Sequence, residues 1–394
     1  MSTPAARLDA VIRTELSGLD AAGLLRHPLS SQSSCDAHVT VAGRDCINAA
    51  SNNALGLSAD PRVRSAAAQA AQQWGAGSGA SRLVSGTLEI HRQLEEEIAR
   101  FKHAQRALVF PTGYMANVGT ITALAHTGDT VIVDKLAHAS IIDGARLSGA
   151  RLRTFAHNDP DHLRTVLGKS ESGRQLVVTE SIFSMDGDAA PLADIASACE
   201  ERGAILMVDE AHATGVLGPT GAGLIEELGL SERVPVSMGT LSKALGSQGG
   251  FVAGSSELVA YLENMARAHI YTTALAPACV GAAREALRLV REEPWRRERV
   301  CAHALRIYQA LERMPGRFHP LTFRRRPAAH IVPAVIGSNE DALARAEALR
   351  AAGVIAPAIR PPTVPAGTAR LRVSCMATHT DADIDAVIAA LAGA

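Results

Sequence analysis

The residue with the clearest chemical potential is Lys243, which lies in a stretch of small and uncharged residues, 237–254. Burial disfavours the charged ammonium form, so a lysine in such surroundings can present a free amine that attacks a carbonyl group and forms a Schiff base. The alternative is an ordinary surface lysine in a turn, which is the more common fate of a single lysine. The Schiff-base interpretation therefore requires partner groups elsewhere in the chain.

An acidic residue and two histidines are candidate partners. Asp209 directly follows the apolar run 204–208, where a carboxylate is unfavourable unless it is paired. It could hold a protonated ring nitrogen, or it could form a structural salt bridge. His212 could donate a hydrogen bond to a phenolate oxygen, and His138 could lie over a planar ring, although a single histidine is more often a satisfied polar side chain. Together with Lys243, these residues suit a ring-shaped carbonyl cofactor.

A phosphate could be held nearby. Gly113 and Tyr114 open a predicted helix, whose first backbone N–H groups and positive dipole end attract an anion. The hydroxyl groups of Ser184 and Thr240 could complete the cradle, whereas the alternative is a capped helix with satisfied hydroxyl groups. A phosphate cradle, a carboxylate for a ring nitrogen, a stacking imidazole and a Schiff-base lysine together describe pyridoxal phosphate.

These residues can share one site only if the segments before them end at one edge of a sheet. Short apolar runs alternate with helical segments between residues 107 and 254, which predicts an α/β fold with a mostly parallel sheet. Ligands bind beyond the carboxyl ends of the strands in such sheets. The expected strands are 107–110, 130–133, 152–155, 175–179, 205–208, 236–238 and 251–253, and the expected helices between them are 115–125, 138–149, 159–167, 192–201 and 223–227.

The rest of the chain predicts two further parts. The expected elements before the sheet are an amphipathic helix over 8–25, a hairpin over 39–48 and helices over 61–74 and 87–100. The expected elements after Pro277 are helices over 278–292, 295–314, 341–352 and from 381 onward, with strands over 331–336 and 368–374. We therefore expect an N-terminal helix and hairpin segment over 1–48, a large cofactor-binding domain over 49–285 and a small α+β domain over 286–394.

The composition excludes several classes of partner. The 394 residues are 47% apolar and 20% charged with a net charge of −1, which predicts a globular chain without the basic surplus of a nucleic-acid-binding protein. No apolar run approaches the length of a membrane span. The six cysteines form no C-x-x-C pair, and the N-terminus has no secretory apolar region. We therefore expect reduced thiols, a cytoplasmic location, and neither a nucleic-acid nor a membrane partner.

Other site chemistries fit the sequence less well. The glycine-rich segment 75–86 lacks the spacing of a dinucleotide fingerprint, and the chain has no G-K-[ST] for a phosphate-binding P-loop. His138 and His212 have no histidine or cysteine at metal-ligand spacing, so we expect no metal site. A G-x-S-x-G elbow of a hydrolase is also absent from the sequence. Segment 75–86 is better interpreted as a loop near a ligand or at a subunit contact.

The chain resembles the α-oxoamine synthases from residue 26 to the end. These are fold-type I pyridoxal phosphate enzymes with an aspartate aminotransferase-like fold, and they condense an amino acid with an acyl thioester and release CO₂. The blocks that carry the resemblance are GSGASRLVSG at 77–86, FAHN at 155–158, VTE and FSMDG within 178–187, MVDEAH at 207–212 and AIRPPTVPAGTARLR at 358–372. The last block favours the activity that joins L-alanine to a pimeloyl thioester, carried by coenzyme A or acyl carrier protein, in biotin synthesis.

The resemblance implies a role for each matching residue. Lys243 would bind the cofactor and move the Cα proton of the amino acid. Asp209 would pair with the ring nitrogen, His212 would contact the ring hydroxyl, and His138 would stack on the ring and touch the substrate. The cofactor phosphate would be held across a homodimer by Gly113, Tyr114, Ser184 and Thr240 of one subunit and Thr272 and Thr273 of the other. The substrate contacts would be Arg26, Asn52, Thr363 and Arg360, the last of which would hold the amino-acid carboxylate.

One block departs from the family pattern. The family usually has S-N-D-Y-L-G-L, whereas this chain has S-N-N-A-L-G-L over 51–57, so the tyrosine is replaced by Ala54. A ring and a hydroxyl group would then be missing near where the substrate enters, which leaves the acyl donor open. The alternatives are an α-oxoamine synthase for glycine or another acyl thioester, and a non-catalytic binding protein on the same fold. Intact Lys243, Asp209 and His212 argue against the last of these.

Overall fold

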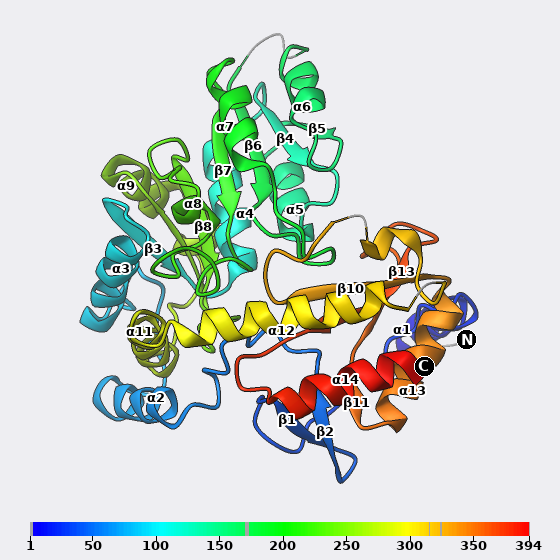
Figure 1. The fold of residues 1–394 in the computed structure, drawn as a ribbon. Helices are drawn as coiled ribbons and strands as arrows, with labels where there is room; N and C mark the ends of the chain where they lie inside the picture. The colour runs from blue at the N-terminus through cyan, green and yellow to red at the C-terminus, as the bar shows by residue number, and fades with distance from the viewer. Residues whose placement is uncertain (1–2, 170–172, 315, 324, 394) are drawn as a thin grey trace.

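A seven-stranded sheet lies at the centre of the computed structural model, which describes residues 3–169, 173–314, 316–323 and 325–393 (Figure 1). All its strands run parallel except β9, which is antiparallel to both of its neighbours. In spatial order, the strands are β3 (Arg106–Phe110), β9 (Gly250–Gly254), β8 (Val236–Thr240), β7 (Ile205–Asp209), β6 (Gln175–Glu180), β4 (Thr130–Asp134) and β5 (Arg151–Phe155). The predicted α/β fold class is therefore confirmed.

Alternate residues of each strand enter two separate apolar cores, because successive side chains in a strand point to opposite faces. In β4, Ile132 packs in one core, and Val131 and Val133 pack in the other. The first face carries α3 (Glu89–Phe101), α6 (Pro160–Leu167), α7 (Leu192–Glu200), α8 (Leu224–Glu227) and α11 (Pro277–Glu292), with α2 (Pro61–Trp74) packed on α11. The second face carries α4 (Gly113–Leu124), α5 (Ala139–Leu147), α9 (Ser256–Met265) and α10 (Arg267–Ile270). Inner strands such as β4, β6 and β7 are covered on both faces and read as nearly continuous apolar runs, whereas the edge strand β5 is only partly covered.

Two small sheets lie beside the central one. The first contains β10 (Ile331–Gly337), β13 (Ala369–Ser374) and β12 (Ala358–Ile359), and the second contains β1 (His38–Val41), β2 (Arg44–Asn48) and β11 (Val354–Ile355). Four helical segments accompany these sheets, namely α12 (Trp295–Glu312), η1 (Pro320–Phe323), α13 (Asn339–Ala351) and α14 (Asp381–Gly393). Because β2 pairs in parallel with β11, the N-terminal hairpin shares a sheet with the C-terminal region. The division of the chain at residues 48 and 285 stays a prediction.

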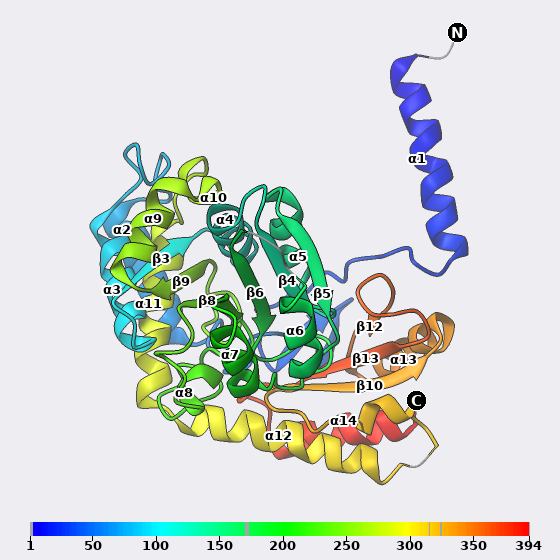
Figure 2. The ribbon, with the colours of Figure 1, turned by 90° about the horizontal axis from the view of Figure 1, so that it is seen from above.

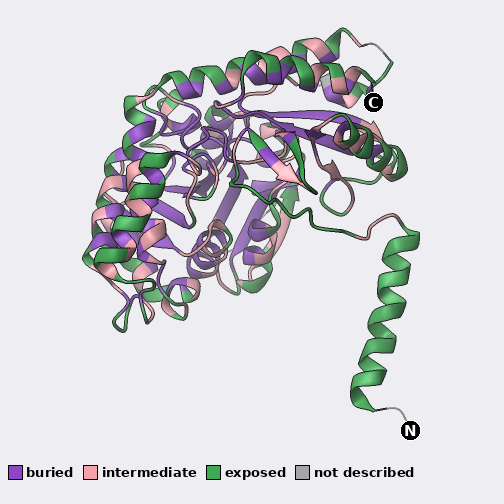
Figure 3. Ribbon diagram, turned by 90° about the horizontal axis from the view of Figure 1, so that it is seen from below, coloured by how far each residue is buried: buried purple, intermediate pink, exposed green. Residues whose placement is uncertain are grey.

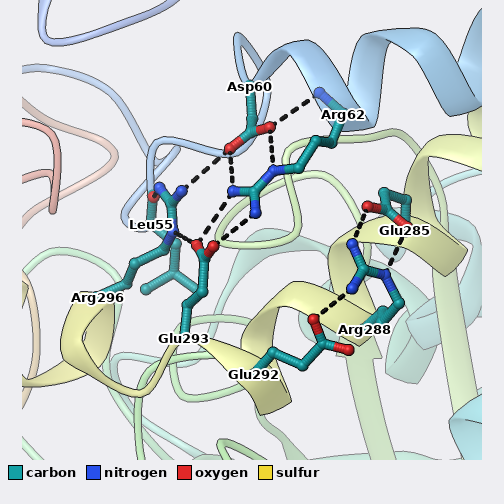
Figure 4. Close-up of polar contacts among 8 residues, drawn as sticks. All are labelled: Leu55, Asp60, Arg62, Glu285, Arg288, Glu292, Glu293 and Arg296. Carbon is teal, nitrogen blue, oxygen red and sulfur yellow. Dashed lines mark hydrogen bonds and ion pairs between the residues drawn. The ribbon is translucent and has the colours of Figure 1, made fainter.

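A network of charged side chains ties the start of α2 to the junction of α11 and α12 (Figure 4). Asp60 caps α2 by accepting a hydrogen bond from the backbone of Arg62, and the Arg62 guanidinium contacts both Asp60 and Glu293. The buried Arg296 bonds to Asp60, to Glu293 and to the carbonyl oxygen of Leu55. This network fixes the position from which α12 runs toward the two small sheets.

The N-terminal helix α1 (Pro4–Ala21) projects away from the body of the protein (Figures 2 and 3). It has no buried residue, although its apolar side chains fall on one face. The sequence predicts this helix over 8–25, whereas it begins after the capping residue Thr3 and ends before Gly23, which has a φ of +63°. The apolar face of α1 is formed by Leu8, Val11, Ile12, Leu16 and Leu19.

The sequence prediction misses five short elements, namely α9, α10, η1, β11 and β12. The segment of α9 does carry apolar residues at helical spacing, namely Leu258, Leu262 and Met265, so this helix had a sequence signal that was overlooked. Strands β11 and β12 contain two residues each, which is below the length at which alternation can be recognised.

Within the described residues, no helix is both long and apolar enough to cross a lipid bilayer.

Candidate active site

Polar side chains gather at the carboxyl edge of the central sheet, where β6, β7 and β8 end. Glu180 and Asp209 are the last residues of β6 and β7, and they lie side by side in the sheet register. Thr240 ends β8, and Lys243 follows in the turn after it. Parallel strands bring their carboxyl ends to one edge, which is why residues far apart in the sequence meet here.

Lys243 is held in a tight turn against the segment before α2. Gly246 has a φ of +60°, and a Cβ atom at this position would collide with the backbone of Ser58, so a glycine is required. Burial lowers the pKa of the Lys243 amine to about 8, although the charges of Asp209 and Glu180 oppose this shift. A substantial fraction of the amine is therefore neutral near pH 8, as nucleophilic attack requires.

Asp209 is a buried carboxylate without a cationic partner among the described residues. Its side chain is 5% exposed, and it accepts hydrogen bonds from the amide of Asn117 at 2.8 Å and the backbone N–H of Ala211 at 2.8 Å. Both donors are neutral, so the structure offers no salt bridge to account for this carboxylate. A protonated ring nitrogen would supply the missing positive charge.

His212 lies directly beside the candidate nucleophile. Its Nε2 atom is 2.8 Å from Nζ of Lys243. Burial and the neighbouring charge of Lys243 hold the pKa of His212 well below its usual value, so the ring is neutral at physiological pH. The Nδ1 atom of His212 has no hydrogen-bond partner among the described residues.

His138 stands at the start of α5 and is linked to Asp209 through other side chains. Its Nδ1 atom accepts a hydrogen bond from the backbone of Ser140 at 3.2 Å, and its backbone N–H donates to Oε1 of Glu180 at 2.7 Å. The amide of Asn117 donates to the Ser140 hydroxyl at 2.9 Å and also to Asp209. Desolvation by the surrounding protein lowers the pKa of His138, although the residue as a whole is exposed. A planar ligand can therefore reach this ring.

The start of α4 and the end of β8 form a cradle without side chains at its centre. A Cβ atom at Gly113 would lie 3.2 Å from Met238 and 3.4 Å from the hydroxyl oxygen of Thr240, so any larger residue would fill the cradle. The first backbone N–H groups of a helix have no intrahelical acceptor, and those of Gly113 and Tyr114 stand at this position. Such a helix end is suited to a phosphate group.

The hydroxyl groups predicted for the cradle differ in their bonding. The Thr240 hydroxyl donates to the carbonyl oxygen of Gly249 at 2.8 Å and lies 2.8 Å from the hydroxyl of Ser242, a neighbour that the sequence reasoning missed. Ser184 follows β6 and is buried, and its carbonyl oxygen is bonded by an arginine described below. The phenol of Tyr114 points to Asp143 at 2.7 Å, so only the backbone of Tyr114 remains for the cradle.

Arg372 is the main site residue that the sequence reasoning missed. It is 4% exposed and donates to the carbonyl oxygen of Ser184 at 2.6 Å, to Oδ1 of Asn52 at 2.9 Å and to the hydroxyl of Ser374 at 2.9 Å. No carboxylate pairs with it among the described residues, and burial lowers its pKa to about 10. Its charge also lowers the pKa of Lys243, so it faces the same site. An uncompensated buried guanidinium is suited to bind an anionic substrate group.

Arg360, predicted to hold that substrate carboxylate, has other contacts. Its guanidinium donates to the carbonyl oxygens of Gly23 and Leu25 in the linker after α1. Burial and the nearby charge of Arg26 lower its pKa. Arg26 and Arg360 line one cavity of about 710 Å³ between this linker, β1 and α13. None of the contacts among the described residues joins either arginine to Lys243, and Thr363 lies in an exposed turn after β12.

Glu180 is a second residue that the sequence reasoning missed. The carboxyl group is buried, and burial together with the charge of Asp209 raises its pKa to about 8. The sequence did contain a signal for Glu180 as a site residue, because it ends strand β6 within the VTE block. Apolar strands ending in an acidic residue are unusual because the charge is desolvated, and both β6 and β7 end in this way.

Thr272 and Thr273 lie beside the glycine-rich segment, and none of the contacts among the described residues joins them to Lys243. Thr273 forms an isolated β-bridge with Ser81, and the next residue, Ala274, donates to the carbonyl oxygen of Ala80 at 3.0 Å. Thr273 is exposed and Thr272 is half-buried. Neither hydroxyl is therefore brought to the cradle of its own subunit by the described contacts.

Ala54, the departure from the family pattern, is enclosed in the protein. Its side chain has no exposed surface and belongs to the apolar core, and its carbonyl oxygen accepts a hydrogen bond from Ala377 at 2.8 Å. The Ala54 methyl group therefore lies behind the substrate-accessible surface, so it offers a substrate no direct contact.

Three comparisons with known proteins agree with this architecture. The family Aminotransferase class I and II matches residues 44–391. The 8-amino-7-oxononanoate synthase of Alcanivorax borkumensis is 50% identical over 355 residues, which cover 90% of this chain and 90% of that protein. A solved structure of SPT with a PLP internal aldimine has a TM-score of 0.92 and 32% identity, and covers 100% of this chain and 98% of that one. A crystal structure of the 8-amino-7-oxononanoate synthase of Francisella tularensis has a TM-score of 0.76 and 27% identity, and the match covers 88% of this chain and 97% of that one.

Proposed function

We infer the activity of this protein from its family, because the chain belongs to the aminotransferase class I and II family. This membership agrees with the resemblance of its sequence to the α-oxoamine synthases, which have an aminotransferase-like fold. We propose that it is a pyridoxal phosphate-dependent acyltransferase. It condenses L-alanine with a pimeloyl thioester to give 8-amino-7-oxononanoate, CO₂ and the free thiol carrier, a step of biotin synthesis. The observation that carries this proposal is the buried amine of Lys243 beside His212 and the unpaired carboxylate of Asp209.

The residues present fit pyridoxal phosphate. Asp209 has the position and the missing positive charge that a protonated ring nitrogen requires. His212 is neutral and can donate to the ring hydroxyl, and His138 is an exposed residue against which a planar ring can lie. The N-terminus of α4, at Gly113, has the open cradle that a phosphate requires. When bound, pyridoxal phosphate supplies a conjugated ring that stabilises negative charge developing at Cα.

Lys243 is the general base of the reaction. Its amine has a pKa of about 8, close to the pH at which a base both is deprotonated and accepts a proton readily. The residue also stands beside His212, so the amine stays within the site when it is not bound to the cofactor. Lys243 therefore takes the Cα proton of the amino acid.

Arg372 holds the carboxylate of the amino acid. Three neutral groups orient its guanidinium, and no carboxylate among the described residues neutralises it. Arg360 instead stands with Arg26 in the cavity beside the N-terminal linker. This proposal assigns to Arg372 the role that the resemblance implied for Arg360, and it assigns to Arg26 and Arg360, which line one cavity, a contact with the acyl donor. Thr363 stays a proposed substrate contact.

The active enzyme is a homodimer with shared sites. Thr272 and Thr273 reach the cofactor phosphate of the partner subunit, which agrees with the position of Thr273 beside the glycine-rich segment at Ser81. The surface around them is unusually apolar, because Leu83, Val84 and Tyr271 are exposed by 58%, 79% and 72%. Exposed apolar groups of this kind typically mark an interface.

A mixing experiment tests the shared site. Lys243→Ala and the double variant Thr272→Ala/Thr273→Ala would each be inactive at limiting cofactor. After the two are dissociated and reassembled together, half of the dimers are mixed, and one site in each mixed dimer is intact. The mixture should therefore recover roughly a quarter of the wild-type activity. A mixture no more active than its two components would exclude the shared site.

A substrate panel tests the reaction itself. Release of the free thiol is measured with L-alanine, glycine and serine, each with pimeloyl, acetyl and palmitoyl thioesters of coenzyme A and of acyl carrier protein. We expect turnover with L-alanine and a pimeloyl thioester, and the two carriers compared directly identify the one that is used. Turnover with another pair but none with this one would replace the biotin assignment by another α-oxoamine synthesis.

The six free cysteines support a cytoplasmic location.

A further inference from the structure

Three buried ring nitrogen atoms near Lys243 have no hydrogen-bond partner within the part of the chain that the structure describes. They are Nδ1 of His212 and both ring nitrogens of His330. The two side chains are 3% and 1% exposed. A buried polar atom without a partner destabilises the folded state, and such atoms are rare in native proteins. Three of them on two neighbouring rings therefore indicate a shared hydrogen-bonding group.

The two rings come from different parts of the fold and meet at the site. His212 follows β7 of the central sheet, whereas His330 directly precedes β10, where its carbonyl oxygen accepts a hydrogen bond from Cys375 at 2.9 Å. Their ring centroids are 5.5 Å apart and their planes are inclined by 31°. Burial and then the charges of Arg372 and Lys243 lower the pKa of His330 to about 3. The ring is therefore neutral, with one donor and one acceptor nitrogen.

The hydrogen bond between Lys243 and His212 determines what Nδ1 of His212 requires. An amine that donates to Nε2 leaves the proton of the neutral ring on Nδ1, which then needs an acceptor. When Nε2 instead donates to a ligand, Nδ1 becomes an acceptor and needs a donor. A neutral imidazole can meet either need. No direct bond joins the two rings, and their separation suits one water molecule between two nitrogen atoms.

We propose that His330 is a positioning residue of the active site, which holds Nδ1 of His212 through one bridging water molecule and so fixes the orientation and tautomer of the histidine beside Lys243. The C-terminal sheet thereby supports a residue of the central sheet. The inference rests on the proposed use of pyridoxal phosphate, but it does not depend on which amino acid or thioester the enzyme uses.

Three substitutions separate this role from simple packing. His330→Leu introduces an apolar side chain of similar size and removes both nitrogen atoms. His330→Asn and His330→Gln place an amide close to the positions of Nδ1 and Nε2, respectively. If His330 only fills the core, the leucine variant is at least as stable and as active as the wild type. If His330 positions His212, the leucine variant loses about tenfold in kcat, and at least one amide variant recovers most of the loss.

A structural readout tests the proposal without catalysis. In the cofactor-free protein, ¹⁵N NMR of the histidine rings should show His212 neutral with its proton on Nδ1, and His330→Leu should shift this signal or mix the two tautomers. A high-resolution crystal structure should show one water within hydrogen-bond distance of both rings. An unchanged His212 signal in the leucine variant, or a bridging position without water, would overturn the proposal. A wild-type protein that binds no pyridoxal phosphate would instead refute the proposed function.

Discussion

Replacement of Arg372 by lysine tests which of two arginines, Arg372 or Arg360, binds the carboxylate of the substrate. The Arg372 guanidinium is oriented by Ser184, Asn52 and Ser374 and lacks an ionic partner among the described residues. A lysine keeps a positive charge but loses the planar pair of donors that binds a carboxylate at two points. Arg360→Lys is the matched control, because Arg360 donates to backbone carbonyl oxygens of the linker after α1.

The expected loss follows from the energy of one charged hydrogen bond. Such a bond contributes about 1.5–3 kcal/mol, and each 1.4 kcal/mol or so corresponds to a factor of ten. Arg372→Lys should therefore raise the KM for L-alanine about tenfold to hundredfold. The KM for the thioester should change much less, because the acyl donor does not bind at Arg372.

Steady-state kinetics with each substrate varied in turn measure this split. In Arg360→Lys we expect the reverse pattern, with the larger change in the KM for the thioester. Circular dichroism and cofactor absorbance serve as controls for folding and cofactor binding. If the KM for L-alanine rises in Arg360→Lys and stays unchanged in Arg372→Lys, the reassignment of the carboxylate is wrong.

Two further predictions concern buried titratable groups. Glu180→Gln keeps an acceptor for the backbone of His138 but removes the negative charge that Glu180 carries as it ionises near pH 8. This charge raises the pKa of the Lys243 amine, so in the variant that pKa should fall from about 8 to a lower value. The pH dependence of amine labelling in the cofactor-free protein measures this, and an unchanged midpoint would contradict it. His157 lies between Asp134 and Asp188 and is hydrogen-bonded to both carboxylates. Burial alone would lower the pKa of His157, but these two hydrogen bonds outweigh burial and raise the pKa to about 9. Because this pKa exceeds the value of about 6.5 in an unfolded chain, the stability from protonated His157 is complete below about pH 6.5 and is lost as the pH rises through 9. In urea unfolding, His157→Gln should therefore be clearly less stable than the wild type at pH 6 and nearly equal to it at pH 10, and an equal difference at both values would refute this origin.

The residues at the carboxyl edge of the sheet could be predicted from sequence, because each one lies at the end of a predicted strand or in the turn that follows it. Asp209 and Lys243 belong to this group, and parallel strands bring such positions together whatever their spacing along the chain. The helices and strands around them could also be predicted where their apolar pattern was long enough.

The remaining site residues depend on tertiary register, which a single sequence does not contain. Arg360, Arg370 and Arg372 stand in one block, and only the pairing of β13 with β10 and β12 decides which of them enters the site. Arg370 pairs with Asp186, whereas Arg372 has no carboxylate partner among the described residues and its charge lowers the pKa of Lys243. His330 had no sequence signal, because its role depends on contact with a ring more than a hundred residues away in the chain. Likewise, the apolar pattern of α1 predicts a helix but not what covers it.

Reduction by sodium borohydride tests the central claim, that Lys243 forms a carbon–nitrogen double bond with pyridoxal phosphate. Borohydride converts such a bond into a stable single bond, and peptide mapping by mass spectrometry then locates the attached pyridoxyl group. We expect one modified residue, Lys243, and no modification in Lys243→Ala. A pyridoxyl group on another lysine, or a reduced protein with none, would contradict this claim.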